Sequence, residues 1–294
     1  MSVVAKCLAR IELVCADPDG LAEFYRAAFG CGGTGCGHAS ADGKVELRLG
    51  DQTIRLIHAG PGGRAYPSGV PGWSPLFQHI AIVAGDIERA YTHLRTIPGW
   101  TPISNSGPQV LPIASGGVTA FKFRDPEGHP LELIAFPAGA VPPQWQTQSR
   151  NLCLGIDHSA VSVSRTATSI AFYESLGLNR SAHSLNVGPE QARLDDLPGA
   201  VVQVTALAPF QTTPHVELLC YQGDFDRRIP AQGIKDITAT RLVLTIQNQV
   251  ALEAICARMS DALLSGPELR EDNSCCRALL QDPDGHLIWL ETAT

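Results

Sequence analysis

The chain has 294 residues, of which 44% are hydrophobic and 17% are charged, and its net charge at pH 7 is -7. This length favours two medium-sized domains, and an acidic balance with no Lys/Arg cluster argues against a nucleic-acid surface. No apolar run approaches the roughly 20 residues that cross a bilayer, and the N-terminus has no signal-peptide pattern, so we expect a cytoplasmic protein without membrane contacts.

A strand, a helix and further strands recur four times along the chain. Short β-type segments begin at Arg10, His79, His158 and Arg241. Apolar residues at helical spacing follow each of them, in residues 17–30, 85–99, 164–177 and 248–266. Behind each helical stretch the pattern changes to the alternation of antiparallel strands. The repeating unit is therefore a strand, a helix and about three strands, and its copies are here called modules one to four.

Connectors rich in Gly, Pro and Ser divide these modules, notably residues 59–75 between modules one and two. We predict that residues 139–151 form a linker between two domains. The first domain is residues 1–138, with modules at about 5–60 and 75–138, and the second is residues 152–294, with modules at about 152–223 and 236–294.

Aligning the modules pairs a residue of each first strand with a residue of each last strand. The four pairs are Arg10 with Arg55, His79 with Glu132, His158 with Glu217, and Arg241 with Trp289. Two modules thus carry a His/Glu pair, and two carry none. Imidazole nitrogen and carboxylate oxygen suit divalent Zn, Ni, Fe, Co or Mn, so His79, Glu132, His158 and Glu217 are the predicted metal ligands.

The helix ends and turns resemble a known family. The helix ends carry FY and a closing glycine (Phe24, Tyr25, Gly30; Phe172, Tyr173, Gly177), and DPxGH turns precede two final strands, at residues 125–129 and 282–286. With the fourfold repeat, these motifs resemble the vicinal oxygen chelate superfamily, which includes glyoxalase I, fosfomycin- and bleomycin-resistance proteins, methylmalonyl-CoA epimerase and extradiol dioxygenases. The resemblance covers nearly the whole chain. It implies an α+β fold of four βαβββ modules, forming two glyoxalase-like domains with curled mixed sheets around clefts.

The same resemblance implies that two modules build each cleft, with metal ligands on their first and last strands. Modules paired in sequence order would set each His/Glu pair against arginine, which stays cationic and cannot ligate a metal. A swapped arrangement, known from single-chain glyoxalases, pairs module one with four and module two with three. It is preferred because it unites His79, Glu132, His158 and Glu217, and leaves Arg10, Arg55, Arg241 and Trp289 in a second, metal-free cleft.

The second cleft has two interpretations. Arg10, Arg55 and Arg241 could bind a carboxylate or phosphate anion if their guanidinium groups converge. Salt bridges to nearby acids such as Glu12 and Glu46 are the simpler alternative.

A metal with two carboxylate and two imidazole ligands points to a glyoxalase-like lyase or isomerase. The substrate would bind through vicinal oxygens, and Glu132 or Glu217 would transfer the proton. An Fe(II) extradiol-type dioxygenase and a non-catalytic, bleomycin resistance-like drug-binding protein are the alternatives. The glutathione-binding arginine of glyoxalase I is replaced here by Val83 and Ser162, so another small-molecule substrate is expected, bound by a monomer or a homodimer.

Overall fold

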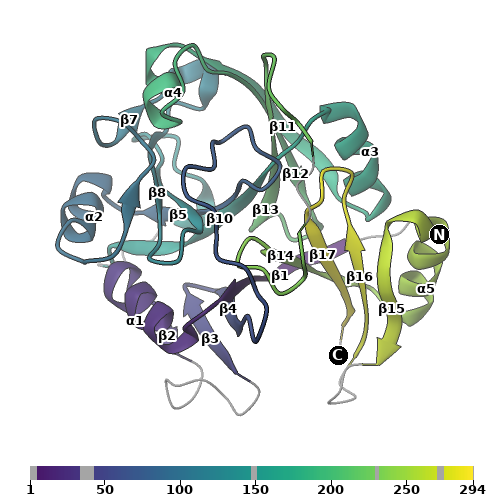
Figure 1. Cartoon of the computed structure of the whole chain (residues 1–294). Helices are drawn as coiled ribbons and strands as arrows, with labels where there is room; N and C mark the ends of the chain where they lie inside the picture. The colour runs from purple at the N-terminus through teal and green to yellow at the C-terminus, as the bar shows by residue number, and fades with distance from the viewer. Residues whose placement is uncertain (1–4, 34–42, 147–150, 229–231, 270–274, 294) are drawn as a thin grey trace.

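The computed structural model describes residues 5–33, 43–146, 151–228, 232–269 and 275–293. It confirms an α+β fold of four modules that form two mixed sheets (Figure 1). Within the described ranges, no helix has the length and apolar character that crossing a membrane requires.

Modules one and four together form a sheet of eight strands. Module one contains β1 (Ala5–Cys15), α1 (Pro18–Phe29), β2 (Gly32–Gly33), β3 (Lys44–Leu49) and β4 (Gln52–His58). Module four contains β14 (Arg241–Ile246), α5 (Gln249–Arg258), η3 (Ser260–Ala262), β15 (Leu263–Leu269), β16 (Cys276–Gln281) and β17 (Leu287–Thr292). The strand order is β15-β16-β17-β14-β1-β4-β3-β2, so the two first strands, β1 and β14, are antiparallel neighbours at the centre.

Modules two and three form the other sheet in the same way. Module two contains β5 (Gln78–Ala84), α2 (Ile87–Leu94), β6 (Thr101–Pro102), β7 (Gln109–Val110), η1 (Ile113–Ser115), β8 (Thr119–Arg124) and β9 (Pro130–Ala135). Module three contains β10 (Cys153–Ser162), α3 (Thr166–Ser175), β11 (Asn179–Val187), α4 (Pro189–Leu194), β12 (Val201–Ala208) and β13 (His215–Tyr221). The order β11-β12-β13-β10-β5-β9-β8-β6 again joins the two first strands, β10 and β5.

Each sheet therefore takes one module from each half of the sequence, which is the swapped arrangement. In Figure 1 the purple strands of module one lie with the yellow strands of module four, although they are the two ends of the chain. The linker, at residues 139–151, contributes η2 (Pro143–Trp145). The division into domains at residues 1–138 and 152–294 stays a prediction. Each of the two sheets contains strands from both ranges.

Local signals explain where the helices start and stop. The carboxylate of Asp17 accepts a hydrogen bond from the Gly20 amide and caps α1, and Gly30 ends it in the left-handed conformation at φ 74°. The helical stretch predicted for residues 248–266 is shorter in the structure. Helix α5 ends at Arg258, and Leu263–Leu269 form the edge strand β15 instead, because pairing with β16 completes the three strands of the module.

Two equivalent contacts lock the sheets together through the DPxGH turns. His129 on the turn of module two contacts the Val14 carbonyl of module one through Nε2, at 2.9 Å, and Asp125 accepts a hydrogen bond from the Tyr25 hydroxyl at 3.1 Å. In the other copy, His286 contacts the Ser162 carbonyl and Asp282 accepts from the hydroxyl of a buried tyrosine on α3. Each turn therefore fixes the position of a module in the opposite sheet.

Candidate metal site

The four predicted residue pairs hold equivalent positions in the two sheets. Glu132 is in register with Ala81, and Glu217 with Ala160, and each of these alanines lies two residues after the histidine of its module. Residues i and i+2 of a strand point to the same face. Arg55 and Trp289 have the same relationship to Glu12 and Val243 in the other sheet.

The two histidines meet where modules two and three join. In the antiparallel pairing of β5 with β10, His79 is in register with Ala160, and His158 with Ala81. Their ring centroids are 5.6 Å apart. The swapped arrangement therefore places the two halves of the predicted site against each other.

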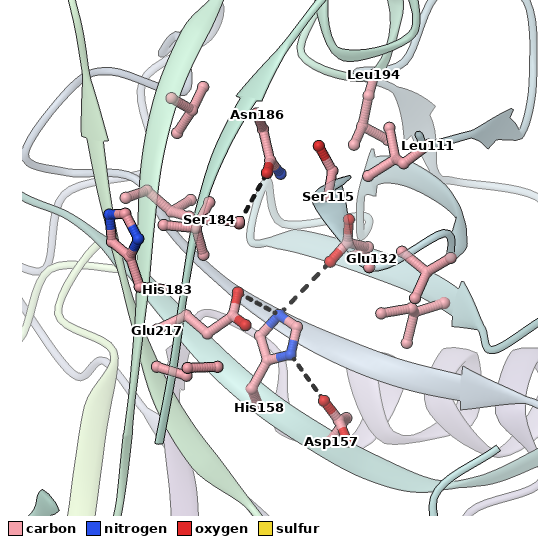
Figure 2. Close-up of a pocket in the computed structure, with 18 of the residues that line it drawn as sticks. Leu111, Ser115, Glu132, Asp157, His158, His183, Ser184, Asn186, Leu194 and Glu217 are labelled. Carbon is pink, nitrogen blue, oxygen red and sulfur yellow. Dashed lines mark hydrogen bonds and ion pairs between the residues drawn. The ribbon is translucent and has the colours of Figure 1, made fainter. Parts of the chain in front are cut away.

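All four predicted ligands come together in the structure, as the close-up in Figure 2 shows for three of them. Glu132 Oε2 lies 3.2 Å from His79 Nε2 and 3.6 Å from His158 Nε2. Glu217 Oε2 lies 3.4 Å from the same His158 nitrogen. His79, Glu132 and His158 each offer one ligand atom within 4.8 Å of the others, and all three are buried.

The Nε2 atoms of the two histidines face the carboxylates. His158 Nε2 is buried between Glu132 Oε2 and Glu217 Oε2, at 3.6 and 3.4 Å, and makes no hydrogen bond, which is costly for a polar atom that has lost its water. A divalent ion would use this nitrogen together with His79 Nε2, which faces Glu132, and the two carboxylates. The donor set, two imidazoles and two carboxylates, therefore fits a metal such as Zn, Ni, Fe, Co or Mn.

The pKa values of the two histidines are shifted in opposite directions. Burial lowers the pKa of His79, and this effect exceeds the opposing attraction of Glu132. Burial also disfavours charge on His158, but Glu217, Asp157 and Glu132 outweigh it and raise its pKa well above the ordinary value. Burial would raise the pKa of both glutamates, yet the neighbouring histidines lower it, so both are carboxylates at neutral pH.

Asp157 was not anticipated from the sequence, although it stands directly before His158. Its Oδ2 lies 3.1 Å from His158 Nδ1, and its Oδ1 accepts a hydrogen bond from Trp145 Nε1 in the linker at 3.1 Å. Neighbouring strand residues normally point to opposite faces. Here the register shifts between Ile156 and His158, as in a β-bulge, and both side chains line the same cavity.

His215 is a further neighbour of the site. It is in register with His158, and its Nε2 lies 3.5 Å from Glu217 Oε1. Together with Asp157 and His158 it forms a second group of side chains whose ligand atoms lie within 4.8 Å of one another. His215 is not among the metal ligands predicted from the sequence.

These residues form one end of a cavity of about 510 Å³. Its walls also include Lys122, which is in register with Glu132 on β8, and residues of β11, β12 and α4. Lys122 is buried and its Nζ lies 2.7 Å from Asp195 Oδ1. Neither Lys122 nor α4 was anticipated from the sequence.

Comparisons with known proteins agree with this architecture. No protein-family model matches the chain, and no curated protein matches its sequence. Among solved structures, glyoxalase I from Zea mays is 17% identical, with 98% of this chain and 92% of that chain covered and a TM-score of 0.64. A mutant of the same enzyme is 16% identical, with 98% of this chain and 94% of that chain covered and a TM-score of 0.66. A candidate dioxygenase from Bacillus subtilis is 13% identical, with 99% of this chain and 86% of that chain covered and a TM-score of 0.60. The chain has the vicinal oxygen chelate fold.

The three arginines of the predicted second cleft are paired with acidic side chains. Arg10 donates two hydrogen bonds to Glu291, at 2.8 and 2.6 Å, and one to Glu12 at 2.8 Å. Arg55 contacts Glu12 at 3.2 Å and Glu46 at 2.8 Å, and Arg241 Nη1 lies 3.8 Å from Glu12. These contacts favour the salt-bridge interpretation. The anion site of Arg10, Arg55 and Arg241 stays a prediction.

Proposed function

We propose that this chain is a metal-dependent enzyme of the glyoxalase type, which binds a small substrate through vicinal oxygens. The observation that carries the proposal is the convergence of His79, Glu132, His158 and Glu217 at one end of a cavity, with Nε2 of both histidines facing the carboxylates. His158 Nε2 is buried without a hydrogen bond, and a cation bound between it and the carboxylates accounts for this arrangement. The sheet of modules one and four has arginine or tryptophan at the equivalent positions. We therefore expect one metal site per chain, in the sheet of modules two and three.

The four side chains would hold a divalent ion, which when bound supplies Lewis acidity to two substrate oxygens. His158 is oriented by Asp157, which is itself held by Trp145. Such contacts fix which ring nitrogen faces the metal and increase affinity for it. The cavity walls hold the substrate and exclude water from the reacting carbons.

We assign the proton transfer to Glu217. Its side chain is 21% exposed, compared with 7% for Glu132. Glu132 lies between the two histidines, whereas Glu217 contacts His158 and the non-ligand His215. Glu217 is therefore freer to take the proton from a hydroxyl-bearing carbon next to a substrate carbonyl and return it to the carbonyl carbon. The hydroxyl proton passes to the former carbonyl oxygen, which completes an isomerisation.

Metal analysis tests the proposal directly. Protein purified without chelator should contain about one transition-metal ion per chain, as the four-ligand set requires, and should regain it after chelation and reconstitution. His79→Ala and His158→Ala should each abolish metal binding. His183 lines the cavity outside the ligand set, so His183→Ala should retain the metal. Far less than one ion per chain, with none regained, would falsify the proposal.

A second reaction has its own support. His79, Glu132 and His158 alone make a set of two histidines and one carboxylate, as in Fe(II) oxygenases. One structurally similar protein is named as a candidate dioxygenase. Oxygen uptake by the iron-loaded protein with a catechol would favour this reaction, and deuterium exchange into hydroxyacetone from D₂O without oxygen uptake would favour the isomerase.

A further inference from the structure

Beyond the ligand set, apolar side chains line the cavity on three sides, beside uncharged polar side chains such as Ser115, Ser184 and Asn186. Ile134 lies on β9, the strand of Glu132, and Phe136 directly follows that strand. Val202 and Leu219 come from β12 and β13. Figure 2 shows Leu111 and Leu194 on the side of the cavity away from His158. These side chains belong to three small apolar clusters separate from the main core. Their free edges form the cavity surface.

The cavity has no unpaired positive charge along this wall. Lys122 is the one lysine or arginine among the described residues that line it. Its ammonium is held by Asp195 at 2.7 Å, and the other Asp195 oxygen accepts from Gln191 at 2.6 Å. All three residues are buried. A substrate anion would have to displace Asp195 from Lys122, which is unfavourable for a buried ion pair.

Negative charge is also concentrated near the metal ligands. Glu132, Glu217 and Asp157 line the cavity, and each has a carboxylate oxygen within 3.6 Å of a ring nitrogen of His158. A divalent ion offsets two of these charges, and little positive charge is left for a second anionic group. An anionic tail in this cavity would be desolvated without a partner.

We infer that the substrate is a neutral molecule with an uncharged, apolar body attached to its two chelating oxygens. This rests on the proposed function, since the chelating end requires the metal. The class includes α-hydroxyketones and similar compounds with alkyl or aryl substituents. It excludes thiol conjugates that carry several carboxylates. A volume of about 510 Å³ accommodates a compact ligand.

Three hydroxamic acids test this inference, because a hydroxamate chelates metals through vicinal oxygens. Acetohydroxamic acid carries the chelating group alone, hexanohydroxamic acid adds an alkyl tail, and adipic acid monohydroxamate replaces the terminal methyl of that tail with a carboxylate. Calorimetry on zinc-loaded protein should show tighter binding of the hexanoyl than the acetyl compound, by up to about fourfold per buried methylene. The carboxylate compound should bind at least about tenfold more weakly than its methyl counterpart.

Variants of the wall sharpen the test. Val204 lines the cavity, and Val187, on the neighbouring strand β11, is exposed and does not. Val204→Lys should shift the preference towards the carboxylate compound, and Val187→Lys should keep the wild-type ratio. Equal or tighter binding of the carboxylate compound by the wild type would overturn the inference while leaving the metal site intact. If no hydroxamate binds better with zinc than without it, the proposed function itself fails.

Discussion

The carboxylate of Asp157 lies 3.1 Å from Nδ1 of His158, and on the opposite side of the ring Nε2 faces Glu132 and Glu217. A proton on Nδ1, donated to Asp157, leaves Nε2 available for a metal. His79 has no such partner, because its Nδ1 makes no hydrogen bond. The two halves of the site are therefore unequal, and the half from module three is the better organised.

Asp157→Asn should weaken metal binding by about 10- to 100-fold. The carboxylate accepts hydrogen bonds from both Trp145 and His158, and an amide has one acceptor oxygen for the two donors. Zinc affinity, measured by competition with a chromogenic chelator, checks this. Asp51→Asn, on an exposed turn, is the control. Unchanged affinity in Asp157→Asn would show that the contact does not orient His158.

The two glutamates should respond differently to the same substitution. Glu217→Gln should retain most of the metal but lower deuterium exchange into hydroxyacetone at least about 100-fold, because the amide cannot accept the proton. Glu132→Gln should mainly lower metal affinity, since Glu132 contacts both histidines. Metal content and exchange by NMR, measured on the same samples, separate the roles. Near-normal exchange in Glu217→Gln would contradict its assignment.

Glu12 should be a major stabilising residue of the second cleft. It is buried and lies within ion-pair distance of Arg10, Arg55 and Arg241. Glu12→Gln leaves these guanidinium groups undercompensated and should cost about 3 kcal/mol of unfolding free energy. Glu46→Gln, which removes the more exposed partner of Arg55, should cost less than about 1 kcal/mol. Urea unfolding compares them, and equal losses would contradict the central role of Glu12.

The same variant tests the predicted anion site. With Glu12 replaced, the arginines should accept an external anion, so sulfate should raise the melting temperature of Glu12→Gln more than that of the wild type. Sodium chloride at matched ionic strength is the control. Equal stabilisation of both proteins would indicate that sulfate does not bind among these arginines.

His129 should make stability depend on pH. Its two ring nitrogens face oxygen acceptors, Asp125 at 2.8 Å and the Val14 carbonyl at 2.9 Å, so the doubly protonated ring suits the site. Burial opposes this charge, but Asp125 outweighs it and raises the pKa of His129 above 6.5. The stabilisation is therefore complete below about pH 6.5 and is lost as pH rises through the folded-state value.

The free-energy difference between wild type and His129→Gln, from urea unfolding, should accordingly be largest near about pH 6 and shrink towards about pH 9. Comparing the two proteins at each pH cancels the titration of other groups. A difference that stays constant across this range would mean that His129 folds in its neutral form.

The repeats were predictable because they depend on local patterns. Helical spacing, Gly30 as a cap and the alternation of strands such as β16 (Cys276–Gln281) are properties of neighbouring residues. The alignment of His79 with Glu132 followed from the repeat alone. The end of α5 at Arg258 was not predictable, because Leu263 and Leu264 continue an apolar pattern that suits either a helix or the edge strand they form.

The residues that sequence reasoning missed make contacts between distant elements. Lys122 pairs with Asp195 across 73 positions, and Asp157 meets Trp145 through an irregular linker. Their equivalent positions in the partner module carry the uncharged Ala206 and Gln78, so alignment of the repeats gives no signal. Which arginines surround Glu12 likewise depends on modules one and four forming one sheet, which only long-range strand pairing decides.

The joining of modules across the two halves has a consequence for how the clefts can diverge. Two identical half-length chains assembled in this way would form two clefts related by symmetry, and every substitution would appear in both. In a single chain each cleft is encoded separately. Arg10, Arg55 and Arg241 could thus replace histidine and glutamate in one cleft while His79, Glu132, His158 and Glu217 persist in the other. Covalent fusion makes it possible for one cleft to specialise in stability and the other in chemistry.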